Sequence, residues 1–134
     1  MGNDNSIEQT ANILFDAIFT NNFDSFKNNI NTLNMNIRYD NYNIIIENQV
    51  INNTYSLMAC CIILNRIDFV KKLLDMNFDI NLKVSIPKQY LLPDCAYFNN
   101  SNHLQLCSYY IYIGNNRNTI MKMLLEYNDR LNIV

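Results

Sequence analysis

One pattern recurs along the chain: a short apolar helix, a brief turn, a second apolar helix, and an exit in which an apolar residue precedes asparagine. The middle copy is the clearest. Residues 55–63 are expected to form a buried helix, and residues 67–76 a second helix with its apolar side chains on one face. Asn77 follows as a left-handed terminator. Such a pair buries too little apolar surface alone, so the copies are expected to stack around a shared core.

Two further copies flank the middle one. The last copy places its second helix at residues 119–127, with Asn128 as terminator and residues 131–132 as the exit. The first copy is more divergent, and its first helix is marked by Ile13, Leu14, Ala17 and Ile18. All three second helices carry a lysine at the same place, with an apolar residue three positions later: Lys27 and Ile30, Lys71 and Leu74, Lys122 and Leu125.

Two short motifs connect these copies with a known family. Residues 102–107 partly match the pattern T-P-L-H-x-A, with Leu104 at the leucine and Cys107 at the small position, and residues 55–60 match it more loosely. Residues 77–81 match the exit Gly-Ala-Asp-Val-Asn. In these segments the chain resembles the ankyrin-repeat family. The resemblance implies a mainly α fold, a short ankyrin-like solenoid of about three helix-pair repeats.

The spacing of the copies departs from that family. The exit asparagines Asn36, Asn81 and Asn132 lie 45 and 51 residues apart, whereas the family period is about 33. The extra residues in each interval predict two long fingers or loops between the repeats. Residues 43–51 favour strand, turn and strand, while two prolines, Pro87 and Pro93, favour a more irregular second insertion. The predicted organisation is one domain, residues 1–134, with repeats at about 10–36, 54–81 and 102–132 and insertions at 37–53 and 82–101.

The amino-acid composition limits both the residues that can take left-handed backbone positions and the kinds of partner that the chain can bind. The chain has 26 asparagines and 2 glycines, so asparagine is expected to take the left-handed positions that glycine usually fills. Net charge is -2 and charged residues make up 16%, which disfavours a phosphate-binding nucleic-acid surface. The adjacent Cys60 and Cys61 lie in an apolar helical run, where free thiols act as small core residues.

The titratable residues give little support for catalysis or metal binding. Cys95, His103 and Cys107 could offer three metal ligands, but their spacing matches no standard zinc pattern. A Cys–His nucleophile pair has nothing to orient it, and two scattered glycines hardly provide a phosphate loop. We therefore expect no enzymatic activity, no metal and no cofactor, with His103 and Cys107 as structural residues.

The amino terminus carries a possible lipidation signal. Residues 1–6 match the N-myristoylation pattern M-G-x-x-x-[ST], which makes Gly2 the candidate acceptor. No polybasic segment follows, so one acyl chain would hold a membrane only weakly. No apolar run approaches the length of a membrane span, and no secretory signal is evident. We expect a cytoplasmic protein without stable membrane insertion, in the host cytoplasm if the chain is viral.

Aromatic residues in the two insertions are the candidate partner-binding residues, because tyrosine offers large contact area at low entropic cost. They are Tyr39, Tyr42, Tyr90, Tyr97 and Phe98. An alternative is that these rings pack beneath their own loops. The last second helix, residues 119–127, is apolar on more than one side, which favours self-association or a docked partner at that end.

The functional expectation follows from the resemblance. Ankyrin repeats imply a non-catalytic protein–protein interaction module, and the AT-rich codon bias implied by asparagine and isoleucine points to a viral or parasite protein that binds and modulates a host protein. One alternative is a compact all-α viral inhibitor of the Bcl-2 type that binds a partner helix. Continuous helix across residues 37–54 would favour it, whereas a hairpin there favours the solenoid. A small metal-dependent enzyme is a further alternative.

Overall fold

The structure is a computed structural model that describes residues 3–46, 49–86, 98–112 and 116–132. Within these ranges the chain is mainly α, with six helices and four strands. The helices are α1 (Asn3–Thr20), α2 (Phe23–Asn29), α3 (Leu57–Leu64), α4 (Ile67–Asp75), α5 (His103–Tyr112) and α6 (Asn118–Asn132). The strands are β1 (Tyr39–Ile46), β2 (Gln49–Tyr55), β3 (Val84–Ile86) and β4 (Phe98–Ser101).

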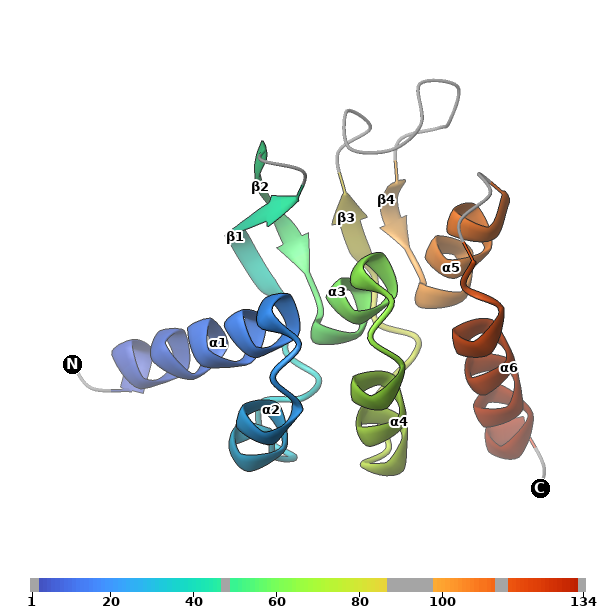
Figure 1. The fold of residues 1–134 in the computed structure, drawn as a ribbon, viewed down its shortest axis with the longest axis horizontal. Coiled ribbons are helices and arrows are strands. Elements are labelled where there is room, and N and C mark those ends of the chain that lie inside the picture. Colours follow the sequence, from blue (N-terminus) through green and yellow to red (C-terminus); the bar gives the residue numbers. More distant parts are fainter. Residues whose placement is uncertain (1–2, 47–48, 87–97, 113–115, 133–134) are drawn as a thin grey trace.

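The helices form three pairs that lie side by side in chain order: α1 with α2, α3 with α4, and α5 with α6 (Figure 1). The first helices contact one another in succession, and so do the second helices, which gives two helical layers. The middle pair therefore has a neighbour on both sides, while each outer pair has one open side. A single apolar core includes residues from all three pairs.

Helix α3 occupies the most enclosed position. Every residue from 57 to 63 is buried. A helix that is apolar on all sides requires such an enclosed place, since any exposed face would present apolar surface to water. The sequence prediction that Cys60 and Cys61 serve as small core residues is confirmed.

Helix α4 is amphipathic and joins the second helical layer. Its buried face consists of Phe69, Val70, Leu73 and Leu74. The Phe69 ring packs against two rings of α2, with centroid distances of 5.3 Å to Phe23 and 4.8 Å to Phe26. The spacing of these residues at three and four positions puts them on one helical face, as the periodicity predicts.

Asparagine takes the left-handed backbone position at three helix ends. The angle φ is 57° at Asn21, 58° at Asn65 and 67° at Asn77. After Asn77, the amide of Phe78 donates to the Leu73 carbonyl at 3.0 Å, which closes the end of α4 as a Schellman motif. At these positions asparagine replaces glycine, as predicted from the composition.

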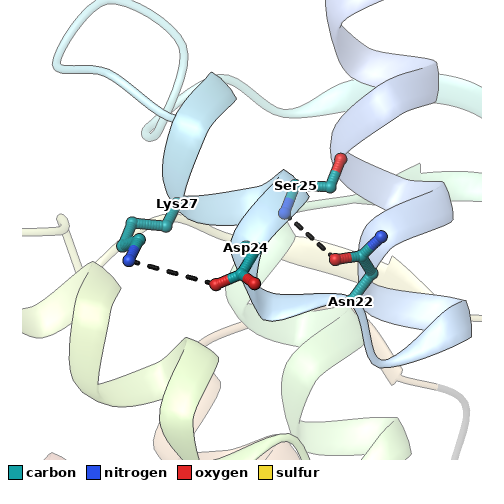
Figure 2. A network of polar contacts seen from close by, with 4 residues as sticks. All are labelled: Asn22, Asp24, Ser25 and Lys27. Carbon is teal, nitrogen blue, oxygen red and sulfur yellow. Dashed lines mark hydrogen bonds and ion pairs between the residues drawn. The ribbon is translucent and has the colours of Figure 1, made fainter.

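Asparagine also begins helix α2. The side-chain oxygen of Asn22 accepts a hydrogen bond from the backbone N–H of Ser25 at 3.1 Å, an N-cap (Figure 2). One turn on, Lys27 lies 4.0 Å from Asp24. Both of these charged side chains are exposed, so the ion pair adds little to stability.

The two insertions contribute strands to one four-stranded sheet in the order β1-β2-β3-β4. β1 and β2 form the antiparallel hairpin predicted for residues 43–51, which pairs Ile44 with Ile51. β2 and β3 are linked by the pair Thr54 and Ser85. The strands lie beside the layer of first helices and extend away from α2, α4 and α6 (Figure 1). Pro87 and Pro93 lie outside the described residues.

The predicted end of the last helix is wrong. Asn128 does not terminate α6, and residues 131–132 form no exit, because the helix continues to Asn132. The difference from α4 lies in the residue that follows each asparagine. Phe78 is buried, so its packing in the core favours a chain that leaves the helix after Asn77. Asp129 is exposed, so no packing of this kind favours a helix end after Asn128.

Three further details differ from the sequence expectations. Helix α1 begins at Asn3, earlier than residue 10, and Ile13 is 42% exposed, unlike the other three apolar residues that mark this helix in the sequence. The helix caps also align Ser56, not Tyr55, with Asn102, so the motif alignment of residues 55–60 is off by one. The residue limits of the three copies stay a prediction.

Candidate protein-interaction surface

Arginine side chains join successive helix pairs. Arg66 follows the left-handed Asn65 and precedes α4. Its Nε donates to the Ile18 carbonyl at 2.7 Å and its Nη2 to the Phe19 carbonyl at 3.0 Å. These two carbonyls lie in the last turn of α1, where helix carbonyls lose their usual amide partners and carry a partial negative charge; the Ile18 carbonyl also accepts from the Asn21 amide at 3.3 Å. The planar guanidinium thus closes the helix end of the preceding pair.

Arg117 repeats this contact one pair further along the chain. Its Nε donates to the Ile62 carbonyl at 2.7 Å and its Nη2 to the Ile63 carbonyl at 3.0 Å. Each arginine directly follows an asparagine and precedes the second helix of its pair. The Asn-Arg dipeptides at 65–66 and 116–117 are the sequence signal of these contacts, which the apolar periodicity does not reveal. These contacts hold the three pairs in fixed relation.

We expect Arg66→Ala to lower the free energy of unfolding by about 1.5–3 kcal/mol, since it removes two charge-assisted hydrogen bonds. Arg66→Lys should recover only part of this loss, because an ammonium group lacks the planar fork. The matched control is Arg38→Ala, which removes one bond to the Lys83 carbonyl from an exposed side chain. Urea melts of the three variants measure the difference, and equal effects of Arg66→Ala and Arg38→Ala would contradict this assignment.

A buried polar pair links the second and third helix pairs. Ser56 Oγ lies 2.5 Å from His103 Nε2, and His103 Nδ1 lies 3.3 Å from the Ile80 carbonyl. A carbonyl only accepts, so Nδ1 carries the imidazole proton. Nε2 therefore accepts from the Ser56 hydroxyl, whose oxygen also accepts from the Ala59 amide at 2.9 Å as the N-cap of α3.

The surroundings of His103 favour its neutral form. Burial lowers the pKa of His103 to about 4, because desolvation penalises the imidazolium more than the Ile80 carbonyl stabilises it. The Phe78 ring meets the imidazole edge-on at a centroid distance of 5.2 Å. A serine–histidine hydrogen bond is typical of nucleophilic sites. Here both side chains are fully buried and satisfied, so the pair is assigned to structure.

The cysteines are placed as unreactive core residues. Cys60, Cys61 and Cys107 are free thiols and buried. Burial raises the pKa of Cys107 to about 11 and raises the pKa of Cys60 and of Cys61 as well. Cys95 lies outside the described residues. In the part of the chain that the structure describes, no three His, Cys, Asp or Glu side chains gather as a metal site.

Two of the candidate binding residues lie on strand β1. Tyr39 and Tyr42 belong to β1, pairing with Tyr55 and Asn53, and a bulge separates the two pairs. Tyr55 and Asn53 are two residues apart on β2, and cross-strand partners share a face. The bulge thus places positions 39 and 42 on one face of the hairpin, although three residues separate them along β1. This common face could not be inferred from strict alternation.

The other candidates are not brought together with these two. Phe98 begins β4 at the opposite edge of the sheet and pairs with Ile86. Tyr90, Tyr97 and the possible lipidation residue Gly2 lie outside the described residues. Of the five candidate residues, the described backbone therefore brings only positions 39 and 42 together, and we call β1 residues 39–42 the hairpin patch.

A hollow away from the hairpin, beside the second helices, is lined mostly by charged residues. It lies between α2 and α4 and is lined by Phe23, Asp68, Lys71, Lys72 and Asp75. Opposite charges alternate around it, with Lys71 3.3 Å from Asp75. Its lining is exposed or half-exposed, so this hollow lacks the enclosed apolar walls of a small-molecule site.

None of the helices in the described ranges combines the length and apolarity needed to cross a bilayer. Searches of protein-family models, of curated proteins and of solved structures give no significant match to this chain.

Proposed function

We propose that this chain is a non-catalytic protein–protein interaction module built as a short ankyrin-like solenoid of three helix-pair repeats. The observation that carries the proposal is the repeated arginine contact. Arg66 and Arg117 each donate to two successive carbonyls at the end of the preceding pair's first helix, at matching distances. Two neighbouring pairs that are joined by the same atoms in the same order support a repeat stack, and such stacks serve as rigid binding scaffolds.

The rival architectures receive less support. Strands at 39–46 and 49–55 occupy the segment where a helix-binding bundle of the Bcl-2 type would need continuous helix. For a metal-dependent enzyme, His103 would have to leave its bonds with Ser56 and the Ile80 carbonyl to reach a metal. Cys107 is buried, and its thiol donates to the Arg117 carbonyl at 3.7 Å.

The proposed partner is a cellular protein, and a host protein if the chain is viral, contacted in the cytoplasm through the hairpin patch. The hairpin projects from a scaffold whose helix pairs are fixed by the arginine contacts, so binding costs little reorganisation. Two tyrosines close together in the sequence of one edge strand suit a protein surface, because tyrosine is enriched at the centre of interfaces.

We expect the double substitution Tyr39→Ser and Tyr42→Ser to abolish partner capture, because it removes both aromatic anchors of the patch. The measurement places a photo-crosslinking amino acid at position 44, across the hairpin from Ile51, and identifies adducts from cell lysate by mass spectrometry. A discrete adduct should form with the parent chain and be lost in the double variant.

The control carries the same crosslinker at Lys71, an exposed residue of α4, and α4 lies on the side of the molecule away from the hairpin (Figure 1). Adducts formed equally from positions 44 and 71 would contradict a hairpin surface. A double variant that loses its cooperative melt would assign the two tyrosines to structure instead.

A further inference from the structure

The three second helices differ in how they bury one pair of equivalent positions. In α2 these are Phe26 and Ile30, and in α4 they are Val70 and Leu74, all of which are buried. The equivalence follows from the lysines that stand three residues before Ile30 and Leu74. In the first two pairs, the next pair of helices is present to cover these positions.

The third pair has no following neighbour in the structure. Its equivalent positions are Met121, which is half-buried, and Leu125, which is 47% exposed, whereas Leu74 is 6% exposed. The change from buried to exposed identifies the side of α6 that faces outward at the end of the stack. This side keeps its apolar residues and forms an uncovered stripe, which we call the α6 stripe: Met121 and Leu125.

Helix α5 behaves differently at the same open end. Counting from the aligned N-caps Ser56 and Asn102, the buried Ala59 corresponds to Gln105 and the buried Ile62 to Ser108. Gln105 and Ser108 are both exposed. Two α5 positions are therefore polar where α3 has buried apolar residues, whereas the equivalent α6 positions stay apolar. A fourth helix pair would bury Gln105 and Ser108, so an occupant that covers the α6 stripe alone suits these residues better.

The charges beside the α6 stripe favour a second copy of α6 as the occupant. Lys122 stands near the amino end of the exposed surface and Asp129 stands two turns later, on the same side of the helix. A second α6 laid antiparallel, with its two-fold axis beside Leu125, brings Lys122 of each copy opposite Asp129 of the other. A parallel arrangement would set this flank of α6 against the opposite flank of the partner helix, so Lys122 would not meet Asp129. Arg130 lies on the side of α6 away from Leu125, over the Tyr127 ring at 5.6 Å.

We propose that the α6 stripe is an isologous contact between two copies of this chain, formed by antiparallel α6 helices. A two-fold contact of this kind closes on itself and leaves both hairpin patches free. A contact whose apolar part is two side chains is small beside the about 1,200 Å² of a stable interface, so we expect a weak dimer that depends on concentration. This inference does not depend on the partner proposed for the hairpin.

Sedimentation velocity of the full chain over a wide concentration range tests the contact. The weight-average mass should rise above the monomer value of 15.8 kDa with concentration. Leu125→Lys should weaken self-association more than about tenfold, because it buries an unpaired charge. Ile13→Lys is the matched control, since Ile13 is 42% exposed on the opposite end of the stack, and it should leave association unchanged.

Charge reversal tests the orientation. Lys122→Asp should weaken the dimer by opposing two acids, and the double variant Lys122→Asp with Asp129→Lys should restore it. A single 15.8 kDa species at every concentration would overturn the proposal. So would a dimer that Ile13→Lys dissociates while Leu125→Lys leaves it intact, or one that the double reversal does not restore.

Discussion

Leu73→Ala is expected to lower the free energy of unfolding by about 2–5 kcal/mol. Leu73 lies in the middle of the buried face of α4 and is fully buried. The shorter side chain loses its transfer free energy and leaves a cavity between the helical layers. The α4 backbone cannot collapse into that cavity, because the Leu73 carbonyl is held by the Phe78 amide at 3.0 Å and Phe78 is itself buried.

Urea denaturation followed by circular dichroism measures this change. Leu33→Ala is the control, because Leu33 is 84% exposed and should alter stability by no more than about 0.5 kcal/mol. A loss below about 1 kcal/mol for Leu73→Ala would contradict the burial of α4 against the rest of the stack.

Acidification should destabilise the fold through His103. Burial lowers the pKa of His103 to about 4 from its ordinary value of 6.5, so between these values the unfolded chain binds a proton that the folded chain excludes. This contribution to stability is fully present above the unfolded pKa and is lost as pH falls toward the folded pKa. It amounts to roughly 3 kcal/mol when fully present.

His103 is the single histidine of the chain, which makes the measurement direct. Its imidazole proton resonances, followed by NMR, should show no titration near pH 6.5 in the folded protein. His103→Gln should remove the histidine part of the pH dependence between pH 7 and 4.5, although it also weakens the link to Ser56. A folded-state pKa near 6.5, or equal pH dependence in both proteins, would refute the buried neutral imidazole.

The sequence predicted the helix pairs because their apolar periodicity was strong. It placed α4 almost to the residue, since Phe69, Val70, Leu73 and Leu74 define one face. It also predicted left-handed asparagines, because only 2 glycines were available for such positions. The hairpin followed from the run Ile44 to Ile46 and the polar turn after it.

Features that depend on distant partners could not be predicted in this way. The arginine contacts join residues that are 47 to 55 positions apart, and no periodic sequence pattern marks them. The residue type alone did not predict the helix end at Asn128, because asparagine permits a left-handed turn but does not require one. After α4 the buried Phe78 favours the turn, whereas Asp129 is exposed and makes no such core contact. The bulge that brings positions 39 and 42 to one face could not be predicted from the regular alternation of faces along a strand either.

The most direct test of the stacked repeat uses the equivalent lysines Lys27, Lys71 and Lys122, which are all exposed. Each pair of positions is replaced by cysteine and spin-labelled, with Cys95→Ser as background, and the buried native thiols stay unlabelled because their pKa values are raised. Packed helices lie about 8–10 Å apart. Dipolar EPR should give similar separations for 27–71 and 71–122, and about twice that separation for 27–122. A 27–122 separation no greater than the other two would contradict a linear stack of three helix pairs.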